Sequence, residues 1–279
     1  MQQDAHDAVA SARCWLFTPG TRTERYDRAA DAGADAVILD LEDSVADDDK
    51  ATARRQVLRY LTSPRGTIVH ALRVNAIGTV SGLRDIAEFI DSDADADVLV
   101  LPKTESAGDL IAMRDILAQS GKRALVMPII ESARGVRDLQ TILTDTGGVA
   151  GVMVGAADLA ADIGGQPDWD VLATARSQIL IAASAARVPV IDSPFFDIND
   201  SAGLKAETEA AHRFGFAAKA AIHPGQVPVI NERFTPTEAQ RIWAHRVLEV
   251  NQAGVGSVDG HMVDQAVARR AHKILARST

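Results

Sequence analysis

Charged residues stand at the carboxyl ends of short apolar runs in this sequence. Five such runs end at Asp40, Arg73, Lys103, Glu131 and Asp158. Buried parallel strands read as continuous apolar runs because helices cover both faces of their sheet. A charge placed where such a run stops lies at the carboxyl edge of the sheet, where α/β enzymes carry out their chemistry. The five endings, with charges of both signs, predict one assembled polar site.

Two of these residues, Glu131 and Asp158, end neighbouring predicted strands and can therefore converge on one cation. Two carboxylates that leave positions open for water and an oxygen-rich ligand suit Mg²⁺. The alternative is that each carboxylate caps the helix that follows it. Both interpretations are compatible with the spacing.

An acidic cluster of Asp40, Glu42 and Asp43 follows the second predicted strand. The mutual repulsion of these groups predicts a positive partner, either the cation or Arg73, which ends the third strand. A guanidinium is planar and permanently charged, so Arg73 suits a carboxylate or a developing enolate oxygen. The alternatives are a structural ion pair for Arg73 and solvated acidic groups at a helix start.

The loop after the first predicted strand combines a tight turn with basic residues. Thr18-Pro-Gly-Thr leads directly into a predicted helix start, which favours phosphate binding. The alternative is a solvated helix face. The candidate residues are Thr21, Arg22 and Arg25, with Lys50, Arg54 and Arg55 as additional charges.

Lys103 and His223 are two further candidates, because lysine and histidine act as catalytic residues in many enzymes. Lys103 has options similar to those of Arg73, and a Schiff-base role would need a depressed pKa, which a rim rich in cations and acids does not provide. His223 lies in the segment Ile222-His-Pro-Gly-Gln226, where a histidine more often holds a turn by hydrogen bonding than acts as a general base. Cys14 lies in a strand-like run without a local partner and is expected to be a core residue.

The elements that position these residues alternate between strand and helix. Strands are predicted at 14–17, 36–41, 67–74, 97–101, 123–130, 151–154, 188–191 and 216–222, and helices at 22–32, 48–61, 82–90, 106–119, 135–143, 170–186 and 201–214. Eight βα units favour an α/β fold of the (β/α)₈ TIM barrel type over an open sheet. No G-x-G-x-x-G fingerprint follows the first strand, which weakens a dinucleotide-binding interpretation.

A barrel over residues 12–235 would be followed by a C-terminal helical extension over 236–279. This extension contains helical patterns at 236–252 and 263–276, joined by a Gly- and Ser-containing link at 253–260. Such a link would let the last helix leave its own barrel.

Composition excludes several classes of protein. The chain has 279 residues, 47% of them hydrophobic, which is enough for one barrel-sized core. A net charge of −9 argues against nucleic acid as the main partner. No apolar run reaches the length of a membrane span, and the N-terminus lacks the pattern of a secretory signal. The single cysteine fits a reducing, cytoplasmic location.

Taken together, the strand ends resemble the citrate lyase β-subunit-like family of CoA-ester lyases, within the HpcH/HpaI aldolase/citrate lyase superfamily. The matching segments run in order through nearly the whole chain. They are LFTPGTR (16–22), GADAVILDLEDSV (33–45), LRVNA (72–76), VLPKTES (100–106), PIIESARG (128–135), GAADLAADIG (155–164), RFGFAAKAAIHPGQV (213–227) and VDGHMVD (258–264).

The resemblance implies roles for individual residues. Glu131 and Asp158 would hold Mg²⁺, with Mn²⁺ as an alternative, and Arg73 would bind the carbonyl or carboxylate region of the substrate. Coenzyme A, as part of the substrate, would lie across the barrel mouth with its phosphates near the basic first units, and the segment with His223 and Gln226 would lie near it. Family members form trimers or hexamers, so a homo-oligomer is expected.

The resemblance also implies a reaction, the reversible cleavage of a β-hydroxyacyl-CoA into acetyl-CoA or propionyl-CoA and a 2-keto acid. Arg73 would oppose the negative charge that develops. Asp264 would reach the site from the next subunit and protonate the enolate carbon. The alternative for Asp264 is a helix N-cap. Asp43 is the third catalytic candidate, and Asp40 and Glu42 join Arg73 and Glu131 as candidate substrate-binding residues.

Two departures from the family pattern leave the substrate acid open between malyl, citramalyl, methylmalyl and citryl thioesters. Ala157 stands where many relatives carry glutamate, and Asp192-Ser-Pro-Phe-Phe differs from the commoner sequence. Other activities also remain in view. They are thioester hydrolysis, a malate-synthase-like condensation, a metal-dependent aldolase acting on free 2-keto acids, and a β subunit that works only within a citrate lyase complex.

Overall fold

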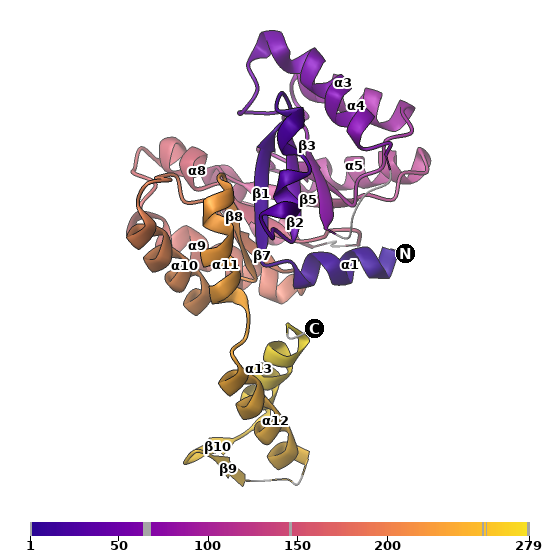
Figure 1. Cartoon of the computed structure of the whole chain (residues 1–279). Helices are drawn as coiled ribbons and strands as arrows, with labels where there is room; N and C mark the ends of the chain where they lie inside the picture. Colours follow the sequence, from indigo (N-terminus) through magenta and orange to yellow (C-terminus); the bar gives the residue numbers. More distant parts are fainter. Residues whose placement is uncertain (1, 64–67, 145–146, 253, 255, 278–279) are drawn as a thin grey trace. The chain divides into compact units, whose positions relative to one another are not determined.

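Eight parallel strands form a closed barrel in the order of the chain, which confirms the predicted (β/α)₈ architecture (Figure 1). The structure is a computed structural model and describes residues 2–63, 68–144, 147–252, 254 and 256–277. The strands are β1 Cys14–Pro19, β2 Ala36–Asp40, β3 Val69–Arg73, β4 Val98–Leu101, β5 Leu125–Ile130, β6 Val152–Val154, β7 Val190–Asp192 and β8 Ala218–Ala221. Their ends lie within two residues of the predicted bounds, and the predicted start at Thr67 falls outside the described residues.

The apolar runs form strands here because side chains cover both faces of the sheet. β2, β4 and β5 are buried along their whole length. Alternate residues fill the barrel interior, where Trp15, Ile38, Val100 and Met127 belong to one core cluster. This packing leaves the residues that follow each run at the carboxyl rim of the barrel.

Most of the predicted helices are present between the strands. They are α3 Lys50–Tyr60, α4 Val80–Asp91, α5 Ala107–Gln119, α9 Trp169–Ala186 and α10 Ser201–Phe214. Two more helices, α1 Gln2–Ser11 and α11 Val227–Phe234, were not expected from the sequence pattern. Within the described residues, no helix has both the length and the apolar character needed to cross a membrane.

Three predictions about helices were wrong. The helix expected at 22–32 is a 3₁₀ turn, Thr23–Arg25, followed by the short α2, Arg28–Asp31. The helix expected at 135–143 is divided into α6, Ala133–Arg137, and α7, Leu139–Ile142. The irregular loop expected after the sixth strand contains α8, Ala156–Ile163, which ends at Gly164 in the left-handed conformation. Glycines on both sides of this eight-residue helix hide its periodicity.

The chain divides into two compact units, Met1–Ile230 and Asn231–Thr279. The second unit contains α12 Glu238–Gln252, α13 Gln265–Ala276 and an antiparallel pair of strands, β9 Gly256–Val258 and β10 His261–Val263. Asp259 and Gly260 join these strands with positive φ angles of 52° and 80°, as a tight hairpin turn requires.

The hairpin corrects the prediction that 253–260 is a plain link, although residues 253 and 255 lie outside the described part of the chain. Buried residues from both helices and both strands, including Val247, Val258, Val263 and Ala271, give this unit its own core.

Candidate active site

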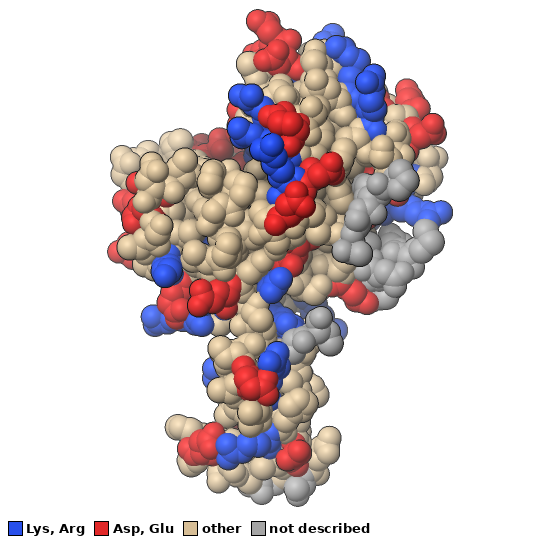
Figure 2. All heavy atoms as spheres, viewed as in Figure 1, with Lys and Arg blue, Asp and Glu red and all other residues tan. Residues whose placement is uncertain are grey.

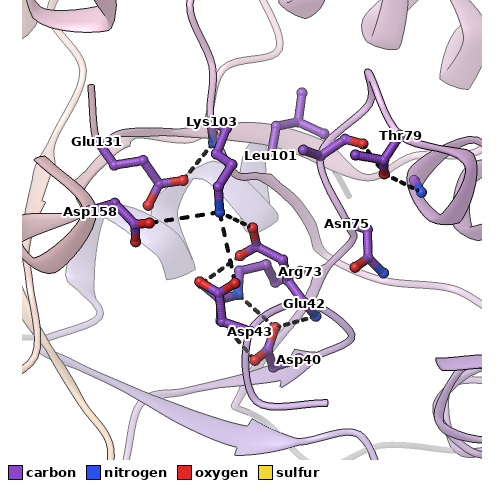
Figure 3. Close-up of polar contacts among 12 residues, drawn as sticks. Asp40, Glu42, Asp43, Arg73, Asn75, Thr79, Leu101, Lys103, Glu131 and Asp158 are labelled. Carbon is purple, nitrogen blue, oxygen red and sulfur yellow. Dashed lines mark hydrogen bonds and ion pairs between the residues drawn. The ribbon is translucent and has the colours of Figure 1, made fainter. Parts of the chain in front are cut away.

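The carboxyl ends of β2 to β6 bring the predicted charged residues together (Figure 3). Strand register places Asp40 of β2 directly beside Arg73 of β3. It also places Ile130 of β5 beside Val154 of β6, so Glu131 and the start of α8 follow from adjacent strands. The barrel thus assembles at one rim the residues that the apolar runs pointed to.

Arg73 is held by two carboxylates from the acidic cluster. Its Nε and Nη2 donate to the two oxygens of Asp40 at 2.6 and 2.7 Å, and Nη1 lies 3.0 Å from Oε2 of Glu42. The guanidinium also lies over the ring of Phe17, 4.8 Å from its centroid. Burial alone would raise the pKa of Asp40, but the charge of Arg73 and the hydrogen bonds from Arg73, Ser44 and Glu42 together outweigh it and lower that pKa. The predicted ion pair is therefore present, and its geometry fixes the plane of the guanidinium.

Lys103 projects its side chain into the middle of the carboxylates. Its Nζ donates to Oε1 of Glu42 at 2.6 Å and lies 3.8 Å from Asp43 and 3.9 Å from Asp158. Burial would lower the pKa of Lys103, but the bond to Glu42 and the surrounding negative charges raise it to about 12. The amine is therefore a permanent cation, in agreement with the expectation that it does not form a Schiff base.

Glu131 is buried beneath this cluster, with 4% of its surface exposed. Its Oε1 accepts a hydrogen bond of 2.6 Å from the backbone N–H of Lys103. Burial, and then the charge of Glu42, raises the pKa of Glu131 to about 8. Gly155 makes room for the carboxylate, since a Cβ at that position would lie 2.3 Å from Oε2 of Glu131.

Asp158 lies half-buried in the first turn of α8, where a carboxylate is favoured by the helix dipole. Glu131 caps no helix, because the side chain of Ser132 caps α6 by accepting from the N–H of Gly135. Among the described residues, no group of three or more His, Cys, Asp or Glu side chains converges as a complete metal site. A pair of carboxylates is nevertheless sufficient for Mg²⁺, which usually retains water and ligand oxygens.

The acidic loop after β2 is supported from behind by two residues that sequence reasoning had not assigned to this task. Lys50 is buried, and its Nζ donates to the carbonyls of Leu41 and Glu42 at 3.0 and 2.7 Å. Asn75 is also buried, and its side-chain amide donates to the carbonyl of Leu41 at 2.9 Å. The ammonium of Lys50 is thus committed to the loop backbone. Only the short segment LRVNA drew attention to Asn75.

The remaining basic candidates divide between exposed and buried positions. Thr21 is half-buried, while Arg22 and Arg25 are exposed and Arg25 lies 3.8 Å from Glu24. Arg54 is buried against Asp85 and Glu88, and Arg55 is exposed. Figure 2 shows Lys and Arg interspersed with Asp and Glu on the visible face of the barrel unit.

His223 and Gln226 hold the turn that follows β8. The N–H of Gly225 donates to Nδ1 of His223 at 3.1 Å. Gln226 is buried, accepts from the N–H of Ile222 at 2.9 Å, and donates from Nε2 to the carbonyl of Phe195 at 2.8 Å. The structure therefore gives His223 the turn-holding role, with its ring exposed.

Asp264 is exposed and caps α13. Its Oδ1 accepts from the backbone N–H groups of Ala266 and Val267, each at 2.9 Å. The helix N-cap, one of the two expected roles, is thus present within the chain.

A second charged network that the sequence pattern did not reveal involves Asp192 of β7 and Lys219 of β8, both fully buried, together with the partly buried Glu207. Lys219 donates to Asp192 at 2.6 Å, to Glu207 at 2.7 Å and to the carbonyl of Ser193 at 2.7 Å. Arg176 reaches the other oxygen of Asp192 at 3.1 Å. The network secures the start of the loop that follows β7. Cys14 is likewise buried, and burial raises the pKa of its thiol, as expected for a core residue.

Comparison with known proteins places this site in a family. The model of the HpcH/HpaI aldolase/citrate lyase family matches residues 13–224. The citrate lyase subunit beta-like protein of Mycobacterium tuberculosis is 38% identical over 275 residues, which cover 95% of this chain and 94% of that protein. The L-malyl-CoA/beta-methylmalyl-CoA lyase of Cereibacter sphaeroides is 31% identical over 300 residues, with coverage of 95% and 94%.

Solved structures show the same similarity. The crystal structure of CitE from Mycobacterium tuberculosis in complex with magnesium, acetoacetate and coenzyme A is 34% identical, with a TM-score of 0.80. The match covers 96% of this chain and 99% of that chain.

Proposed function

This chain belongs to the HpcH/HpaI aldolase/citrate lyase family and is a lyase, and we propose that it cleaves a carbon–carbon bond of a β-hydroxyacyl-CoA in a Mg²⁺-dependent reaction. The products would be acetyl-CoA and a 2-keto acid, and the substrate a malyl, citramalyl, methylmalyl or citryl thioester. The observation that carries this proposal is that Glu131, after β5, and Asp158, at the start of α8 after the neighbouring β6, lie close together. The guanidinium of Arg73, paired with Asp40, lies near them.

The residues at the rim fit a hard divalent cation. The donors are carboxylate oxygens, and Gly155 leaves a space at Oε2 of Glu131 that a Cβ would fill. Glu131 and Asp158 would hold the ion. When bound, Mg²⁺ would supply a Lewis acid for the carboxylate and hydroxyl oxygens of the 2-hydroxy acid.

Arg73 would orient the acid and oppose its developing charge. Two of the five N–H groups of the guanidinium donate to Asp40, and Nη1 forms an ion pair with Glu42 without a hydrogen bond, so N–H groups on both terminal nitrogens remain for a ligand oxygen. Because both carboxylates fix the plane of the group in advance, little reorganisation is needed when charge develops at the substrate.

Proton transfer at the enolate carbon is assigned in this proposal to Asp264 of a neighbouring subunit in a homotrimer or homohexamer. Three observations support that assignment. The residue is exposed, it belongs to the separate C-terminal unit, and its two hydrogen bonds as an N-cap both use Oδ1, which leaves Oδ2 for another group. Asp43, which is 58% exposed beside Lys103, is the base candidate within the same chain.

The phosphates of coenzyme A are assigned to the first loop. Thr21, Arg22 and Arg25 offer a backbone turn and exposed charges there. His223 and Gln226 would contribute by shaping the neighbouring turn rather than through free charges.

The proposal is tested by incubating the purified protein with Mg²⁺ and each of the four thioesters, and by trapping any keto acid as its hydrazone. Cleavage yields a keto acid and acetyl-CoA, whereas thioester hydrolysis yields a hydroxy acid and free CoA. A chain that acts only after citrate lyase partner subunits are added would be a subunit of a complex. If no keto acid forms from any thioester under either condition, the lyase proposal fails.

A further inference from the structure

Lys103 has a backbone conformation that its residue type rarely adopts. Its φ is 53°, in the left-handed region, although it carries a full side chain. L-residues with a Cβ disfavour this region, and such outliers gather at functional sites. The conformation aims the backbone N–H of Lys103 at Oε1 of Glu131, 2.6 Å away. The residue thus fixes the carboxylate of Glu131 through its main chain.

The side chain of the same residue returns to the same cluster. The ammonium lies 2.6 Å from Glu42, 3.8 Å from Asp43 and 3.9 Å from Asp158 (Figure 3). The side chain of Lys103 is 43% exposed, so water reaches it and it has room to move. A single cation therefore stands where several carboxylates meet.

We propose that Lys103 sets the affinity of the site for its divalent ion, by holding Glu131 in place through its N–H and by opposing the ion through its ammonium. This inference rests on the proposed function, since it takes Glu131 and Asp158 as the residues that bind Mg²⁺. It adds a residue outside the carboxylate pair and assigns opposite effects to its main chain and its side chain.

The physical reason is charge. A dication bound between Glu131 and Asp158 would lie within a few ångströms of the ammonium, and like charges at such a distance repel strongly in a partly buried site. In the ion-free protein the ammonium also forms ion pairs with Glu42 and Asp158, and a bound divalent ion would compete with it for these carboxylates. Removing the charge while keeping the backbone N–H should therefore strengthen ion binding.

The test is calorimetric titration of MgCl₂ into the full-length protein in the absence of any acyl-CoA. Lys103→Gln keeps the N–H and a side chain of similar length but removes the charge, and we expect its Kd for Mg²⁺ to fall at least about tenfold. Lys103→Arg keeps the charge and should stay within about threefold of the wild type. Lys205→Gln removes the same charge from an exposed position on α10 and should leave the Kd unchanged. Circular dichroism verifies that each variant is folded.

Two negative outcomes can be told apart with Glu131→Gln and Asp158→Asn as companions. If both companions lose Mg²⁺ binding while Lys103→Gln binds no more tightly than the wild type, the inference about Lys103 is overturned and the proposed metal pair stands. If the companions bind Mg²⁺ as the wild type does, the metal pair and the inference fall together.

Discussion

Replacing Glu131 by glutamine should abolish a pH dependence of stability that the ion-free protein owes to this one group. Burial and the charge of Glu42 raise the pKa of Glu131 in the folded protein from 4.5 to about 8. The folded state therefore holds a proton that the unfolded state releases at lower pH. This contribution to stability is complete below 4.5 and is lost as the pH rises through about 8.

The magnitude follows from the pKa difference. One pKa unit corresponds to about 1.4 kcal/mol, so the ion-free wild type should lose on the order of 3 to 4 kcal/mol between about pH 5 and about pH 8. A typical domain is stable by about 5–15 kcal/mol, so this loss is readily measured. Glu131→Gln lacks the ionisable group and should lose correspondingly less.

Urea denaturation followed by far-UV circular dichroism, at several pH values in EDTA, measures the free energy of unfolding for both proteins. Adding Mg²⁺ near pH 8 should restore stability to the wild type by binding its folded state and leave Glu131→Gln unchanged. Equal losses of stability with pH in the two proteins would refute the assignment of the buried charge to Glu131.

Three further perturbations address the packing and the ion pairs around the site. Gly155→Ala would bring a Cβ within 2.3 Å of Oε2 of Glu131, so the carboxylate must move, and turnover should fall about 10²-fold with a matching loss of Mg²⁺ affinity. Unchanged Mg²⁺ affinity would contradict this. Arg73→Lys keeps the charge but loses the two-pronged contact with Asp40, and turnover, followed by keto-acid release, should fall about 10²–10³-fold. A variant as active as the wild type would exclude a role for the guanidinium geometry. Lys219→Met breaks the fully buried ion pair with Asp192 and should lower the free energy of unfolding in urea by about 3–5 kcal/mol. A change below about 1 kcal/mol would show that the network adds little.

The barrel and the composition of its rim were predictable because both depend on local features of the chain. Continuous apolar runs mark strands covered on both faces, and the charges that end them must lie at one rim once the strands are parallel. Asp40, Arg73, Lys103, Glu131 and Asp158 do gather there. The helix predicted at 201–214 is also observed at these bounds, where the side chain of Asp200 caps its start and Gly215, in the left-handed conformation, ends it.

The tertiary structure decided whether each Lys or Arg side chain is exposed or bound to other groups of the protein. Lys50 and Arg54 look alike in sequence to the exposed arginines of the first loop, yet one supports backbone carbonyls and the other is buried in an ion pair. Their partners belong to other parts of the chain, so no local sequence pattern indicates which positive charge is already bound within the protein. The same holds for Gly155, whose importance depends on how close the side chain of Glu131 approaches.

The sequence by itself determined which residues reach the barrel rim, because the length and polarity of each run set where a strand ends. Only the closed barrel decided which of them touch, because strand register and burial bring together groups that are far apart in the chain. Arg73 meets Asp40 across a distance of 33 residues, and Lys103 meets Glu42 across 61. Pairings of that kind are set by three-dimensional closure, and they determine which charges remain available to an ion or a substrate.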